Sequence, residues 1–186
     1  MNKFNYDLDF KTTDFRKNPE LYRIGVGEQG VLLVEPYKSE ILPFWKFKNV
    51  EIAKKSSQEI YTLFENYLKD NDFIGADMAR KYLQMGFTRA RRYANHSDGN
   101  KYSKEKYFDE SKEYPYSSGS KYRQNPILPQ SDDALTNEKA QVASIFKVVW
   151  FKAKDNPEYL KQKLEFKKKY YEIDLVTAQI LSKNID

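Results

Sequence analysis

The sequence of 186 residues is long enough for one folded domain, and its lack of cysteine excludes disulfides, thiolate zinc sites and cysteine nucleophiles. The formal net charge of +5 is unevenly placed: residues 80–106 carry eight Lys or Arg against two acids, and residues 146–170 carry eight Lys against three acids. These segments have net charges of +6 and +5, so the rest of the chain totals −6. Such a separation steers anionic partners toward the basic surfaces.

Composition also bears on the compartment. No stretch approaches the roughly 18 uninterrupted apolar residues of a membrane span, and the charged start, MNKFNYDLDF, lacks the apolar segment of a signal peptide. An aromatic content of 16% indicates a folded core rather than disorder. We therefore expect a soluble cytoplasmic protein that does not bind membranes.

Residues 1–48 are predicted to be rich in β-structure. Residues 5–10 alternate apolar and polar side chains, as a half-buried strand does. Val31–Val34 is an apolar, partly β-branched run that follows glycines and ends just before Pro36. Pairing of such segments predicts a small antiparallel sheet.

Helical patterns follow this segment. Residues 49–95 contain two predicted helices and residues 136–183 contain two more, each with an apolar face. Residues 96–135 between them form a polar loop, longer than most compact domains contain without a use for it. The predicted fold is therefore α+β: one domain over residues 1–186, with a small antiparallel N-terminal sheet packed with about four helices.

Gly25, Gly27 and Gly30 match the dinucleotide-binding pattern G-x-G-x-x-G. In that fold the loop opens a helix whose N-terminal amides hold the pyrophosphate, whereas the following Val31–Val34 is predicted to be a strand. A kinase glycine loop lies between strands, but the H-R-D and D-F-G motifs of a kinase are absent. We interpret the segment as a tight turn between two paired strands, whose glycines supply positive φ. A backbone cradle for phosphate is the alternative.

The second predicted helix is the most informative segment. At about 100° per residue, one face holds mainly small residues, which allow another element to approach closely; these are Ala79, Leu83, Gly86, Ala90 and Ala94. Cations cover the remaining surface and are expected to reach solvent; these are Arg80, Lys81, Arg89, Arg91 and Arg92. Residues 80–92 contain four arginines but no glutamate four residues away to pair with them. Stabilisation of the helix by ion pairs therefore does not explain these arginines.

Lysines and tyrosines alternate at the end of this helix and after it. Arginine binds phosphate oxygens bidentately, and aromatic rings beside cations are what single-stranded nucleic acids stack on. The sequence therefore predicts a surface that binds nucleic acid or another polyanion, formed by Arg80, Arg89, Arg91, Arg92, Lys101, Tyr93, Tyr102 and Tyr107. The alternative interpretation is a solvated face whose arginines pair with acids elsewhere.

Two other functions are kept open. In a small enzyme acting on a phosphorylated or carboxylated metabolite, the arginines would clamp the anion and His96 would act as the general acid or base. That enzyme would have a closed pocket where the glycine loop meets His96, with Glu28 or Glu35 nearby. In an interaction protein without catalysis, the long loop would be the docking segment. No cofactor or metal site is predicted.

Several longer motifs resemble one family. They are residues 5–10, 18–23, 27–32, 35–40, 42–47, 78–81, 85–96 and 155–160. Together they resemble a family of small bacterial and phage proteins known as a domain of unknown function (number 4385). The resemblance covers most of residues 4–165 and implies the cytoplasm of a bacterial cell or phage-infected host. It implies no reaction, cofactor or catalytic residue.

Overall fold

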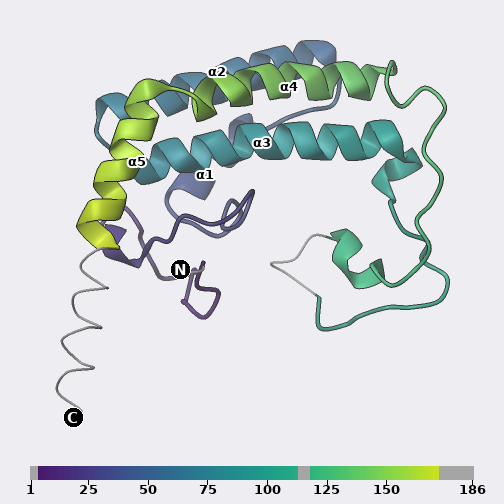
Figure 1. Ribbon diagram of the computed structural model, residues 1–186, viewed down its shortest axis with the longest axis horizontal. Helices are drawn as coiled ribbons and strands as arrows, with labels where there is room; N and C mark the ends of the chain where they lie inside the picture. Colours follow the sequence, from purple (N-terminus) through teal and green to yellow (C-terminus); the bar gives the residue numbers. More distant parts are fainter. Residues whose placement is uncertain (1–3, 113–117, 172–186) are drawn as a thin grey trace.

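The computed structural model describes residues 4–112 and 118–171, and helices dominate them (Figure 1). The long helix α3 packs against α2 and α4, and α5 runs across the end of the bundle at which α3 begins (Figure 1). None of the helices in the described residues has the length and apolarity that crossing a membrane requires. The α-helices are α1 (Tyr37–Ile41), α2 (Val50–Lys69), α3 (Phe73–Asn95), α4 (Glu138–Lys154) and α5 (Pro157–Tyr170).

The predicted α+β fold with an N-terminal antiparallel sheet is wrong. The described residues form no sheet, and Val31–Val34 is a series of turns in which Leu33 and Val34 donate their amides to the carbonyl of Gly30. Polar side chains in the predicted strand region bond to nearby backbone instead: Asp9 accepts from the amide of Lys11, and Asp14 accepts from those of the next residues. Such local bonds compete with strand pairing.

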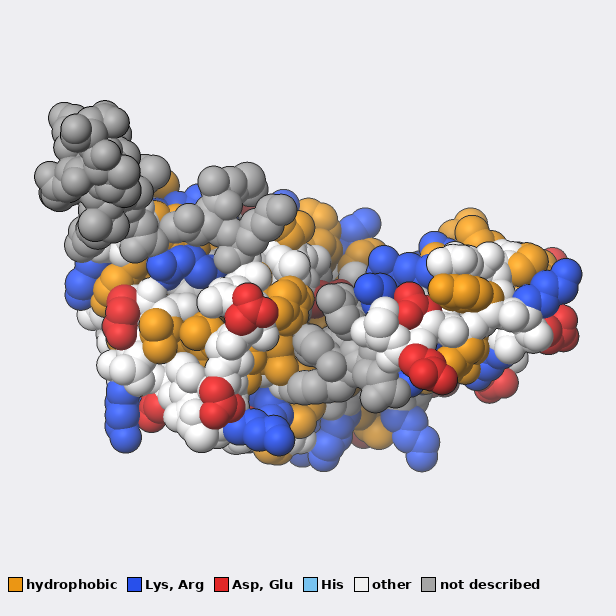
Figure 2. Space-filling model, turned by 90° about the horizontal axis from the view of Figure 1, so that it is seen from below, with side chains coloured by type: hydrophobic (Ala, Val, Ile, Leu, Met, Phe, Trp, Pro, Cys, Tyr) orange, Lys and Arg blue, Asp and Glu red, His pale blue; other side chains and the backbone are white. Residues whose placement is uncertain are grey.

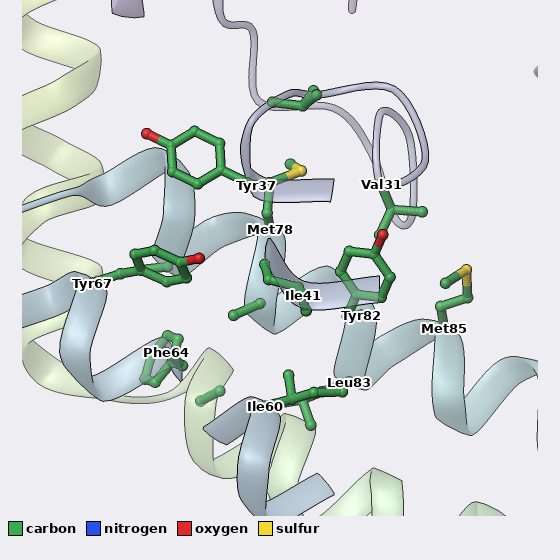
Figure 3. Packing of buried hydrophobic residues seen from close by; sticks show 14 of the residues in the cluster. Val31, Tyr37, Ile41, Ile60, Phe64, Tyr67, Met78, Tyr82, Leu83 and Met85 are labelled. Atoms are coloured by element: carbon green, nitrogen blue, oxygen red, sulfur yellow. The ribbon is translucent and has the colours of Figure 1, made fainter. Parts of the chain in front are cut away.

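Apolar residues of the N-terminal segment insert one at a time into the core of the helices and do not form one face of a strand. Phe4, Phe15, Tyr22, Val31 and Val34 are buried in the same core cluster as the helices. The alternating segment itself is not buried in this way, because Tyr6 is exposed and Leu8 and Phe10 are only partly buried. Figure 3 shows Val31 beside Tyr82 and Met85 of α3.

The four predicted helices are present, whereas the short α1 was not predicted. Each long helix begins at a residue whose side chain accepts a hydrogen bond from an amide of the first turn, which satisfies a donor that the helix itself cannot. The part of the last predicted helix beyond residue 171 lies outside the described residues. The four caps are Asn49, Asp72, Asn137 and Asn156.

The prediction that small residues of α3 allow a close approach is confirmed. Ala79, Leu83, Gly86, Ala90 and Ala94 are all buried. At Gly86 the ring of Phe146 from α4 lies so close that an added Cβ would be 2.3–2.6 Å from its carbons. The absence of a side chain at this position therefore sets how closely α3 and α4 pack.

Replacing Gly86 by alanine should lower the free energy of unfolding by about 1–3 kcal/mol, because the new methyl group overpacks the buried ring of Phe146. This loss is expected although alanine ordinarily favours a helix over glycine by roughly 0.5–1 kcal/mol. Urea unfolding measures the change. Adding Phe146→Leu should relieve part of the loss, so strictly additive effects of the two substitutions would contradict this packing.

The predicted long loop forms a lobe beyond the C-terminal end of α3 (Figure 1). Residues 96–137 contain two short 3-10 turns, Ser97–Gly99 and Ser118–Tyr122, but no α-helix or sheet in their described part. Asn125 is buried, and its side-chain amide donates hydrogen bonds to the carbonyls of Ser103 and Tyr107. These bonds connect the second half of the loop to its first half.

Candidate functional site

A recess of about 520 Å³ lies where the end of α3 meets the lobe. Five cations line it, and no Asp or Glu among the described residues does. On the face shown in Figure 2, the lobe on the right carries Lys and Arg side chains next to hydrophobic ones. We call this recess the basic recess; its cations are Arg92, Lys101, Lys104, Lys121 and Arg123.

Aromatic rings alternate with these cations, as the lining also includes Tyr102, Phe108 and Tyr122. The ammonium nitrogens of Lys101, Lys104 and Lys121 lie 5.4, 6.0 and 4.9 Å from the ring centroids of Tyr102, Tyr122 and Phe108, respectively. The rings of Phe108 and Tyr122 meet edge to face at 5.6 Å. The basic recess therefore offers positive charge and aromatic surface side by side.

Arg92 is the member that α3 contributes. Its side chain is half-buried, and no described residue accepts a hydrogen bond from its guanidinium or forms an ion pair with it. Burial and the positive charge of Arg89 lower the pKa of Arg92 from its ordinary value, and Glu28 only partly opposes them. A crowded cation without a carboxylate partner favours the binding of an anion.

A second depression of about 370 Å³, the glycine groove, adjoins the basic recess because Arg123 lines both. It lies between residues 26–33 and α3, and Arg89 also lines it. Gly27 and Gly30 have φ angles of 61° and 84°, so the prediction of positive φ is confirmed for these two glycines but not for Gly25. The predicted pair of strands on either side of the turn is wrong. The Glu28 carboxylate accepts a hydrogen bond from Thr88.

The prediction that Arg80 reaches solvent is wrong. Arg80 is buried, and its Nη2 lies 2.9 Å from Oδ1 of Asp77, one turn earlier on α3. The neighbouring Lys81 is also buried; its Nζ donates to the carbonyl of Gln29 at 2.8 Å and lies 3.5 Å from Asp77. Asp77 stands three residues before Arg80 and four before Lys81, so it is an acid at pairing distance on the same helix, which the prediction based on glutamates left out.

Asp77 is the centre of this buried network. Besides the two cations, it accepts hydrogen bonds from the hydroxyls of Tyr22 and Tyr159. Burial alone would raise the pKa of Asp77, but Arg80 and Lys81 together with these hydroxyls hold it well below its ordinary value. Burial lowers the pKa of Lys81 to about 8, although Asp77 opposes this shift. These groups are used in the core and do not line the basic recess.

Arg91 and His96 attach the lobe to the end of α3. Nη1 of Arg91 donates to the carbonyl of Ala134 at 3.0 Å, and its other terminal nitrogen donates to the side chain of Asn95. His96 is buried, and its Nδ1 donates to the carbonyl of Pro129, 3.2 Å away. Both side chains therefore position the loop rather than face a ligand in the basic recess.

The enzyme arrangement predicted from the sequence does not form in the described residues. The glycine turn meets Arg89 and Arg123, whereas His96 lines neither the basic recess nor the glycine groove. Glu35 pairs with Lys38, 2.8 Å away, at a different part of the surface. The acid or base, the glycine turn and the proposed carboxylates are thus not gathered in one pocket.

Of the predicted binding residues, the structure brings Arg92, Lys101 and Tyr102 together in the basic recess, with Arg89 in the adjoining groove. Two predicted tyrosines lie outside it: Tyr93 is exposed near Gly99 and Phe47, and Tyr107 is exposed further along the loop. Sequence reasoning missed a second alternation of basic and aromatic residues later in the loop. The residues missed are Phe108, Lys121, Tyr122 and Arg123, whereas Lys104 belongs to the alternation already noted after the helix.

A larger cavity of about 710 Å³ lies at the opposite end of α3. Six of its fifteen lining residues are aromatic, and its charged residues have both signs. Arg16, one of its cations, is already bound by Glu40 at 2.7 Å and Asp72 at 3.1 Å. The three acids that line this cavity, Asp70, Asp72 and Glu165, outnumber its two cations, whereas no described acid lines the basic recess.

The chain was compared with family models, curated proteins and solved structures, and a family model matches it. No curated protein and no solved structure matches the chain. A family model described as Domain of unknown function (DUF4385) matches residues 5–169, a range that includes the glycine turn, α2 to α4 and the whole lobe. The bacterial or phage setting implied by the resemblance stays a prediction. Because the match covers most of the 186 residues, the chain belongs to this family of domains of unknown function.

Proposed function

We propose that this protein binds nucleic acid or another polyanion at the basic recess. The observation that carries the proposal is the lining itself, in which five cations converge without a described Asp or Glu among them. Arg92, Lys101, Lys104 and Arg123 form no ion pair with a described residue. Lys101, Lys104 and Arg123 are exposed, whereas Arg92 is half-buried. An unpaired cation as deep as Arg92 is costly to the fold, so it is expected where a ligand supplies the opposite charge. Phosphate oxygens are well suited to this role, because arginine and lysine bind them through charge-assisted hydrogen bonds.

The distribution of the cations favours a polymer over a single phosphate. Arg123 lies between two adjoining depressions, and Arg89 extends the positive lining into the glycine groove. Among the described residues, no acceptor binds the backbone amides of Gly27 and Glu28, so both remain available to solvent or to an anion. This availability supports the phosphate-cradle alternative considered for the glycine turn, as a second subsite of the same surface.

A titration against salt tests the proposal. Fluorescently labelled oligonucleotides of mixed sequence and an inorganic polyphosphate are titrated with the full chain, with anisotropy as the readout, from about 50 to 200 mM salt. Affinity should fall log-linearly with salt, and contacts from about five cations imply a slope near −3.5 on single strands. A protein that binds none of these polyanions at the lowest salt, where the electrostatic attraction is strongest, does not have the proposed function.

A further inference from the structure

We infer that the polyanion is an unpaired nucleic-acid strand, one base of which enters the basic recess and stacks on its aromatic rings. This inference rests on the proposed function and narrows it to one class of ligand. The shared chemistry is that of single-stranded DNA and RNA, in which phosphates alternate with bases whose flat faces are free.

The aromatic rings in the basic recess indicate a ligand that contains more than phosphate groups. An aromatic face carries negative charge density and repels an anion that lies over it. The hydroxyls of Tyr102 and Tyr122 could donate to phosphate, but a site for polyphosphate alone gains nothing from the ring of Phe108, which also lines the recess. A nucleotide uses both kinds of surface, because its phosphate binds the cations while its base stacks on a ring.

Phe108 is the ring best placed for this contact. Its residue surface is 49% exposed, although the ring lines the recess and contacts the edge of Tyr122. A phenylalanine that served only the core of the lobe would be buried. Lys121 lies over the same ring, 4.9 Å from its centroid, so positive charge stands next to the place where a base would stack.

The concave shape of the site selects an unpaired strand. In a duplex the base faces are covered by their neighbours and the phosphates are outermost, so rings that line a recess cannot reach a face. In a single strand a base can turn into the recess while the next phosphate reaches Arg123 and the glycine groove. The two adjoining depressions therefore suit consecutive nucleotides of one strand.

Oligonucleotides that differ only in their bases test the inference. The probes are strands of about 15 nucleotides, near the upper site size of single-strand-binding folds: a mixed DNA, the same sequence as RNA, an abasic DNA with the same number of phosphates, and the duplex. At one salt concentration, a base-containing strand should bind about tenfold or more tightly than the abasic strand. The DNA and RNA strands show which sugar the site accepts.

Two single variants locate the contact. Phe108→Leu should remove most of the advantage of the base-containing strand while leaving binding of the abasic strand unchanged, which also shows that the variant is folded. Ile127→Ala is the control, because Ile127 belongs to the same lobe, is 63% exposed and does not line the recess; this variant should bind like the wild type.

The outcomes separate the inference from the proposed function. Equal affinity for the abasic and base-containing strands overturns the inference and leaves polyanion binding intact. Equal losses in the two variants would also overturn it, because the stacking contact would not be at Phe108. No binding of any probe at low salt would instead overturn the proposed function.

Discussion

Replacing Asp77 by asparagine should lower the free energy of unfolding by about 3–5 kcal/mol, the usual cost of removing one partner from a buried ion pair. Asparagine keeps the shape, but its single side-chain oxygen can replace only one of the two oxygens to which Tyr22 and Tyr159 donate. It also leaves the buried charges of Arg80 and Lys81 without a counter-ion. Urea unfolding followed by circular dichroism measures the loss. Because a domain of this kind is typically stable by only about 5–15 kcal/mol, this substitution takes a large share of the total.

The matched control for Asp77 is Glu59→Gln, which removes an exposed pair with Lys55 at 3.9 Å and should change stability by less than about 1 kcal/mol.

The pH dependence of the free energy of unfolding gives a second test of the Asp77 network. Because the pKa of folded Asp77 is held below its ordinary value, its stabilisation is present above about pH 4 and is lost as the pH falls further. The asparagine variant should lack this part of the acid dependence. A loss no larger than that of the control would show that the network is not a main support of the core.

Removing three cations from the basic recess should weaken binding to a single strand about 100-fold at 0.1 M salt, since each phosphate contact contributes roughly 0.7 to the logarithmic salt slope. The variant replaces Arg92, Lys101 and Arg123 by alanine, and its slope should be shallower by about 2. Their side chains make no hydrogen bond or ion pair with the described residues, so the fold should tolerate the change. Anisotropy titrations at several salt concentrations give both numbers.

A second triple variant separates the recess from general positive charge. Lys161, Lys167 and Lys168 are exposed on α5, at the end of the bundle away from the lobe (Figure 1). Replacing them by alanine changes the net charge equally but should weaken binding by less than about threefold, because salt screens charges this far from the ligand. Equal losses in the two triple variants would place binding on the whole basic surface rather than in the recess.

The helices could be predicted from the sequence because their signals are local. The cap residues Asn49, Asp72, Asn137 and Asn156 act within one turn of the helix that each begins, and a helical face follows from residue spacing alone. The prediction of an N-terminal sheet was wrong because a sheet, unlike a helix, depends on contacts between distant parts of the chain. Alternation over residues 5–10 indicates a strand face, but strand pairing needs a partner far away in the sequence. Local side-chain hydrogen bonds of Asp9 and Asp14 compete with such pairing.

The sequence by itself determined where positive charge and aromatic rings are concentrated, and it identified the face of α3 that α4 covers. Only the tertiary structure decided which cations are free to bind. Arg80 is neutralised by Asp77 in the core, and Arg91 is used to attach the lobe, whereas Arg92 has no partner among the described residues. The physical reason is that the charge of a side chain is a property of the sequence, while its burial and its partners depend on segments far apart in the chain. Arg123 joins Arg92 because the lobe folds back on α3.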